Sequence, residues 1–172
     1  DCGGLVSYNC YSGEPVTGLE EGRPLLVRQP ENKLTLGNFM RAQLYAAMAT
    51  LQIGMDILWK ENVQVEKLYG HGGLFKTKGV GQRLLAGALG VPVAVMETAG
   101  EGGPWGMALL AAYRKNHQEG ESLADYLEQK VFAGAAGDCV EPLPEDKAGF
   151  GTYIQRYRAG LAVEKAAGEA LK

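Results

Sequence analysis

The chain has 172 residues, of which 46% are hydrophobic and 22% are charged. This length and composition predict one globular domain with a single substantial core, and they exclude an intrinsically disordered chain. The net charge of -3 excludes the broad positive field that attracts nucleic acid or anionic lipid, and no apolar run reaches the roughly 20 residues that cross a bilayer. We therefore expect neither a nucleic-acid partner nor a membrane anchor.

The cysteines indicate the cellular compartment of the protein, and the first residues indicate whether the chain is part of a longer protein. Cys2, Cys10 and Cys139 are odd in number and lack the spacing of a metal site, so we expect reduced thiols in a cytoplasmic protein and no bound metal. The chain opens at Asp1 with the loop-like sequence DCGG. We therefore expect it to be a piece of a longer protein.

The first third of the sequence predicts short strands followed by a long helix. Residues 1–33 are rich in Gly and Pro around two short apolar runs, which indicates short strands or a hairpin. Residues 35–59 carry apolar side chains mostly three or four positions apart, which predicts a helix buried on more than one side. The apolar positions of that helix are Leu36, Phe39, Met40, Leu44, Ala47, Leu51 and Leu58.

The middle of the chain alternates strands and helices. VQVEKLYG predicts a strand that runs into a glycine turn, and KTKGVGQRLLAGALG predicts a helix that ends near Gly90. VPVAVM predicts a buried strand, and WGMALLAAYRKNH predicts a helix with Pro104 in its first turn. Alternation of this kind is typical of an α/β layer with parallel strands.

The last third predicts mainly helices. Ser122 and Asp125 resemble a helix-capping pair before LADYLEQKVF, and a loop is expected around Pro142, Pro144 and Gly149. The tail then places Phe150, Ile154, Tyr157 and Leu161 on one face of a long helix. The division is thus a strand-and-turn segment over 1–33, an α/β core over 34–113 and a helical tail over 114–172.

Two glycine clusters, residues 70–73 and 100–103, follow the two predicted parallel strands. Main-chain amides point outward where a strand enters a helix, and glycine lets a ligand approach them closely. Ligands of open α/β sheets also collect at this edge of the sheet. The two clusters together predict a phosphate or nucleotide site, although tight strand-to-helix turns require glycine for structural reasons alone.

Named nucleotide motifs match poorly. A phosphate loop of the Walker type needs Lys directly after its last glycine, and GHGGLFKTKG does not provide it. The dinucleotide fingerprint begins at Gly70-His71-Gly72, but its third glycine position is Phe75. Glu97 stands where a ribose-binding acid is expected, so a dinucleotide-binding domain remains an alternative.

The sequence resembles a known enzyme family over residues 63–113. GGLFKT with Gln82, then LGVPVAV, then GGPWGMALLAAY, is similar to the carboxyl-terminal half of the FGGY carbohydrate kinases, most of all to xylulokinase-like members. The likeness extends more loosely to the opening residues and to the helix over 35–59. It implies an α/β fold of the ribonuclease H-like, actin-like ATPase type, truncated at its start.

The resemblance also implies a site and a reaction. Gly72 and Gly73 would approach adenosine and the α-phosphate of ATP, Leu74 would lend its amide, and Thr77 would lie near adenine. Gly102 and Gly103 would form the turn before the last core helix, where Gly106 and Ala108 would allow close packing at the hinge between two halves. Leu74 and Phe75 depart from the family pattern, and Phe75 could narrow the pocket.

The resemblance places the remaining machinery outside this chain. The family's catalytic aspartate and most sugar contacts belong to the preceding amino-terminal half, and residues 1–33 do not match the loop that grips the outer phosphates. We therefore expect no catalytic residue here, and a fragment that is inactive alone. The full-length protein would use ATP and Mg2+ to phosphorylate a sugar, with a ketopentose such as xylulose as the acceptor.

Other polar and aromatic residues have simpler interpretations. His71 is expected to bond to backbone, His117 to complement a helix dipole, and Asp138 to be unrelated to catalysis. Lys76 and Lys78 are expected to be solvated, and Phe150, Tyr153 and Tyr157 to be core or a patch covered by other sequence. A non-catalytic association module is the competing function, and a homodimer is one assembly that the sequence allows.

Overall fold

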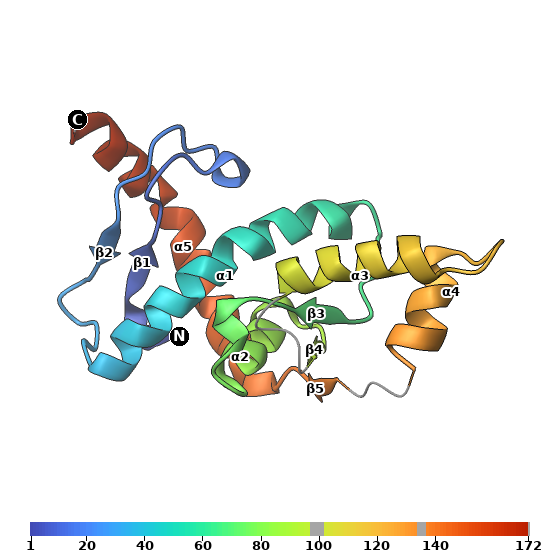
Figure 1. The fold of residues 1–172 in the computed structure, drawn as a ribbon. Coiled ribbons are helices and arrows are strands. Elements are labelled where there is room, and N and C mark those ends of the chain that lie inside the picture. Colours follow the sequence, from blue (N-terminus) through green and yellow to red (C-terminus); the bar gives the residue numbers. More distant parts are fainter. Residues whose placement is uncertain (97–101, 134–136, 172) are drawn as a thin grey trace.

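A computed structural model describes residues 1–96, 102–133 and 137–171 of the chain. It holds two small sheets joined by long helices (Figure 1). One sheet is a two-stranded hairpin on the left of the view, and the other is a three-stranded sheet in its lower right half. Among the described residues, no helix is long and apolar enough to cross a membrane.

The hairpin confirms the strands predicted in residues 1–33. β1 (Val6–Tyr8) pairs antiparallel with β2 (Leu25–Val27), and Val6 lies opposite Val27. Short 3-10 turns precede and follow β1 at Cys2–Gly4 and Pro15–Thr17. All three residues of β1 are buried, because α1 and α5 both contact this strand.

The long predicted helix is α1 (Leu36–Lys60), and the Thr35 side chain caps it by accepting from the Asn38 amide at 3.2 Å. The prediction that its apolar stripe is buried on more than one side is wrong. The buried residues are Ala42, Tyr45, Ala46, Met48, Ala49 and Met55. Small side chains let α2, β1 and α5 approach this face closely, and most of the larger aliphatic residues face outward.

The second sheet has the order β3-β4-β5. β3 (Leu68–Gly70) and β4 (Val93–Val95) are parallel, as predicted, with Gly70 opposite Val95. The connection between them is α2 (Val80–Leu89), which ends at Gly90 in the left-handed conformation. β3 is shorter than VQVEKLYG suggested, since it begins only at Leu68.

The region after β4 has less burial. α3 (Gly102–Asn116) contains Pro104 in its first turn, as predicted, and has no buried residue among those described. α4 (Leu123–Tyr126) continues into a π-helical turn, Leu127–Val131. The Ser122 hydroxyl accepts from the Asp125 amide at 3.1 Å and lies 2.6 Å from its carboxylate, which confirms the capping pair.

The predicted loop around Pro142, Pro144 and Gly149 is wrong in extent. β5 (Asp138–Val140) pairs antiparallel with β4, so the tail also contributes a strand. α5 (Pro144–Ala170) already begins at Pro144, because proline suits the first turn of a helix, where its missing amide is not needed. Gly149 therefore lies inside this helix.

Aromatic side chains form the centre of the core and join the two ends of the chain. Tyr8, Tyr45, Phe150, Tyr153 and Tyr157 are all at most 1% exposed. The Tyr8 hydroxyl donates to the Tyr157 carbonyl at 2.8 Å, and the Tyr153 hydroxyl lies 3.2 Å from the carbonyls of Ser7 and Ala42. The expected core packing of the α5 aromatic residues is confirmed.

Candidate functional site

The first glycine cluster forms a turn at the end of β3. Gly72 has φ 98° and ψ -173°, a backbone conformation that residues with a Cβ rarely adopt. An ideal Cβ at Gly72 or Gly73 would have no other residue within 4 Å. The backbone conformation at Gly72 therefore requires glycine. No described neighbour covers the Cβ positions of Gly72 and Gly73.

The main chain of this turn has donors that the described protein does not use. Gly73–Phe75 is a single 3-10 turn in which Phe75 and Lys76 amides bond back to the Gly72 and Gly73 carbonyls at 3.1 and 3.2 Å. No side chain caps the turn, and the amides of Gly73 and Leu74 have no partner among the described residues. Two adjacent free amides at an open surface suit an anionic or polar ligand.

Phe75 does not cover this open surface. Its ring folds back beneath the strand end, where an ideal Cβ at Gly70 would overlap it, and it packs against the core. Gly70 is therefore required by the close approach of the ring. Phe75 thus stays clear of the Cβ positions of Gly72 and Gly73, but it also lines the hollow beside the start of α2.

A hollow of about 320 Å³ lies beside the start of α2. Thr77 and Lys78 line it from the turn, Gln82 from α2, and Asp138 from β5. The Gln82 side chain is buried and donates to the Val93 and Asp138 carbonyls at 2.9 and 2.5 Å, which fixes the edge strand to β4. The amino end of α2, with Gly79 as its cap, favours negative charge in this hollow.

The second glycine cluster lies against the first. Gly102 starts α3, and an ideal Cβ there would lie 2.9 Å from the Cβ and Nδ1 of His71. No described residue lies within 4 Å of the Cβ position of Gly103. The start of α3 therefore lies against the first turn at His71. Glu97, Gly100 and Glu101 lie outside the described residues.

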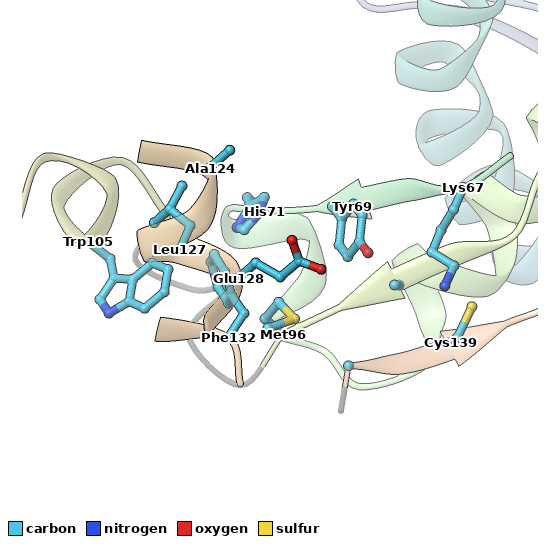
Figure 2. Close-up of a pocket in the computed structure, with 12 residues that line it drawn as sticks. Lys67, Tyr69, His71, Met96, Trp105, Ala124, Leu127, Glu128, Phe132 and Cys139 are labelled. Atoms are coloured by element: carbon cyan, nitrogen blue, oxygen red, sulfur yellow. The ribbon is translucent and has the colours of Figure 1, made fainter. Parts of the chain in front are cut away.

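A larger pocket, about 780 Å³, opens on the α3 side of the second sheet. Figure 2 shows Lys67, Tyr69 and His71 along β3 facing the helical segment that carries Glu128, whose carboxylate lies between the Tyr69 and His71 rings in this view. Trp105 and Phe132 close one end, with ring centroids 5.6 Å apart. The pocket combines aromatic walls with a few charged groups.

Sequence analysis missed this pocket apart from His71. Three of its residues, in β3 and directly beside its two ends, stand at positions 67, 69 and 71, which is the spacing of one face of an extended segment. That alternation could have identified the sheet side of the pocket. The opposite wall, which includes Glu128, comes from a segment about 60 positions later in the chain. No local sequence pattern predicts that this segment packs opposite β3.

The structure does not place the six predicted nucleotide-binding residues in one cavity. Gly72, Gly73 and Leu74 lie on the open turn, and Thr77 lines the smaller hollow. Gly102 and Gly103 lie at the start of α3, and Gly102 is close to His71, which lines the larger pocket. All six are on the same end of the second sheet, around the carboxyl ends of β3 and β4.

The remaining candidates have ordinary structural roles. The His117 ring lies 3.0 Å from the Tyr113 carbonyl through Nδ1, at the carboxyl end of α3, which is the expected helix-terminal position. Asp138 is an exposed residue of β5. The described residues contain no group of three or more His, Cys, Asp or Glu that could hold a metal ion.

Comparison with known families gives a match over most of the chain. The model described as "FGGY family of carbohydrate kinases, C-terminal domain" matches residues 1–114. A comparison with curated protein sequences gives no significant match.

Solved structures share the fold at low sequence identity. A ligand-bound xylulose kinase from Lactobacillus acidophilus has a TM-score of 0.70 at 17% identity, over 98% of this chain and 33% of its own length. A gluconate kinase from the same organism scores 0.67 at 16%, over 98% and 32%. A glycerol kinase from Plasmodium falciparum with ADP scores 0.66 at 16%, over 96% and 31%. The chain thus spans about a third of each of these kinases.

Proposed function

Because the chain belongs to the FGGY family of carbohydrate kinases and has the actin-like ATPase fold of its C-terminal domains, we propose that it is the ATP-binding part of a sugar kinase. The observation that carries this proposal is the open turn at Gly72 and Gly73, where the amides of Gly73 and Leu74 have no partner among the described residues. ATP supplies the transferable phosphoryl group, and a sugar hydroxyl accepts it.

Each of the six residues has a role in this proposal. The Gly73 and Leu74 amides donate to ATP near its α-phosphate, while Gly72 gives the turn its shape. Thr77 lines the hollow that receives the adenine side of the nucleotide. Gly102 and Gly103 bring the start of α3 close to the turn, so that the two strand ends bound one nucleotide site.

Among the described residues, no group of three or more His, Cys, Asp or Glu could hold a metal ion. The chain's own contribution is therefore to bind and orient the nucleotide by main-chain donors and shape. We propose that the catalytic base, the outer-phosphate contacts and most sugar contacts come from other parts of a longer cytoplasmic protein. A ketopentose such as xylulose is the proposed acceptor, supported by the similarity to a xylulose kinase.

Thermal melting of the chain tests the binding role. A ligand that binds only the folded state adds about 2.7 kcal/mol of stability at a hundred times its Kd. We expect ATP with Mg2+ to raise the Tm, and Gly72→Ala to reduce that rise, because alanine strains the turn. Gly151→Ala on α5 is the control, since its Cβ position is open and distant in sequence from the turn.

The same melts separate the alternatives. A rise in Tm with NAD but not with ATP would identify a dinucleotide-binding domain. No rise with either ligand would favour an association module without nucleotide chemistry. For the acceptor, ADP release by the full-length protein with xylulose, gluconate or glycerol would show which sugar it phosphorylates, and we expect xylulose to give the highest kcat/KM.

A further inference from the structure

Asp138 brings a carboxylate to the hollow beside the start of α2. It is the first residue of β5 and pairs with Val95, which in turn lies opposite Gly70 at the start of the first glycine turn. At about 4.8 Å per strand, Asp138 lies about 10 Å across the sheet from Gly70. Figure 1 shows β5 beside β4 at the edge of this sheet. Asp138 is therefore at the same end of the sheet as the open turn.

The main chain at Asp138 is held in place, while its carboxylate is available to a ligand. The Gln82 side chain is buried and donates to the carbonyls of Val93 and Asp138 at 2.9 and 2.5 Å, so both hydrogens of its amide group are used. The Asp138 side chain is exposed, and no described residue forms a hydrogen bond or an ion pair with its carboxylate. Lys78 lines the same hollow but does not pair with it.

The charge of Asp138 determines which part of a nucleotide can lie beside it. A carboxylate only accepts hydrogen bonds and repels phosphate, so the phosphates are directed away from β5 and toward the amides of Gly73 and Leu74. The 2′- and 3′-hydroxyls of ribose are adjacent neutral donors, which suits the two oxygens of one carboxylate. In dinucleotide-binding domains, an acidic side chain accepts a hydrogen bond from a ribose hydroxyl in the same way.

We propose that the Asp138 carboxylate binds the ribose hydroxyls of the nucleotide, and that Gln82 is the positioning residue that holds Asp138 in place. This inference rests on the proposed ATP site and adds a second fixed point to it, because the turn binds phosphate and β5 binds ribose. Asp138 takes no part in phosphoryl transfer. Its contact makes the site select nucleotides that carry both hydroxyls.

Calorimetric titration of the chain with ATP and with 2′,3′-dideoxy-ATP, both with Mg2+, tests the contact. We expect the parent chain to bind ATP about tenfold more tightly, because the dideoxy analogue lacks the hydrogen bonds to the charged group. Asp138→Ala should abolish this preference by weakening ATP binding alone. Asp138→Asn should keep part of it, since the amide oxygen still accepts. Glu141→Ala is the matched control, because it removes the same charge from an exposed residue outside the lining of the hollow.

The outcomes separate this inference from the nucleotide proposal. No binding of ATP by the parent chain would overturn both. Equal binding of ATP and the dideoxy analogue, or equal weakening of both by Asp138→Ala, would overturn the ribose contact and leave the nucleotide proposal standing. Inosine triphosphate is the third ligand. If Asp138→Ala abolishes a preference for ATP over inosine triphosphate instead, the carboxylate binds the adenine amino group and the ribose assignment is wrong.

Gln82→Met tests the positioning step. Methionine keeps the length of the side chain but removes both donors, so the Asp138 carbonyl is no longer held by α2. We expect the preference for ATP over the dideoxy analogue to fall by at least half. Because the preference is a ratio, a variant that is only less stable keeps it. Gln155→Met, at an exposed glutamine of α5, should leave the ratio unchanged. A full preference in Gln82→Met would show that Gln82 does not position Asp138.

Discussion

The aromatic core and the glycine turns use opposite side-chain chemistry. Around Tyr8, Tyr153 and Tyr157, rings and hydroxyls fill the space between the hairpin, α1 and α5, and every one of these side chains is buried. At Gly72 and Gly73, side chains are absent, and the amides of Gly73 and Leu74 have no partner in the described part of the chain. Side chains thus close the core that joins the two ends of the chain, whereas their absence leaves the turn after β3 open.

The largest expected effect is on the core. Tyr153→Ala should lower the free energy of unfolding by about 3–5 kcal/mol, because it removes a buried ring and leaves the Ser7 amide without its hydroxyl partner. Tyr69→Ala, at a residue 61% exposed near the glycine turn, should change it by less than about 0.5 kcal/mol. Denaturant titrations measure both, and equal losses would show that the two regions do not differ as described.

Two glycines of α5 allow a packed and an open position to be compared within one helix. An added Cβ at Gly160 would overlap the Tyr8 hydroxyl, so Gly160→Ala should cost about 1–3 kcal/mol of stability. At Gly151 no residue lies within 4 Å of the Cβ position, so Gly151→Ala should stabilise the helix by up to about 1 kcal/mol. Urea melts of the two variants should move in opposite directions. A stabilising Gly160→Ala would show that the Tyr8 contact is loose.

A smaller, pH-dependent effect is expected at the edge of the core. Glu164 is fully buried, accepts from the Arg23 amide at 2.6 Å, and keeps its other oxygen without a partner. Burial raises the pKa of this carboxyl above its ordinary value of 4.5. The folded state therefore holds the proton more tightly than the unfolded chain, and this group's contribution to stability declines as the pH rises above 4.5.

Glu164→Gln should remove that decline, because a neutral amide can still accept from the Arg23 amide and does not titrate. We expect the stability difference between the variant and the parent to grow in favour of the variant from pH 4.5 to about 7. Unfolding titrations at several pH values measure it. A constant difference over this range would show that Glu164 does not titrate with folding.

Sequence reasoning predicted the elements that rest on local signals. The helix at Val80–Leu89 with its Gly90 end, the parallel strands and the Ser122 cap all depend on patterns within a few residues, and the structure confirms them. The buried side of α1 was predicted wrongly, because periodicity finds a face but does not say what covers it. Small residues such as Ala42 and Ala49 were buried by helix packing, which is a tertiary effect.

The candidate site was predictable in outline only. The position of both glycine turns at one sheet end follows from strand order, and the contact of Gly102 with His71 agrees with it. The direction of the Phe75 ring and the pocket walls near Glu128 depend on packing between segments far apart in sequence. No local pattern carries that information.

Amide chemical shifts of the 15N-labelled chain test the central claim most directly, since the claim concerns main-chain donors. On addition of ATP with Mg2+, the account predicts the largest changes at Gly73 and Leu74, smaller ones at Thr77, Gly102 and Gly103, and none at Gly151. Unchanged signals at Gly73 and Leu74, with the nucleotide either unbound or bound elsewhere, would contradict it.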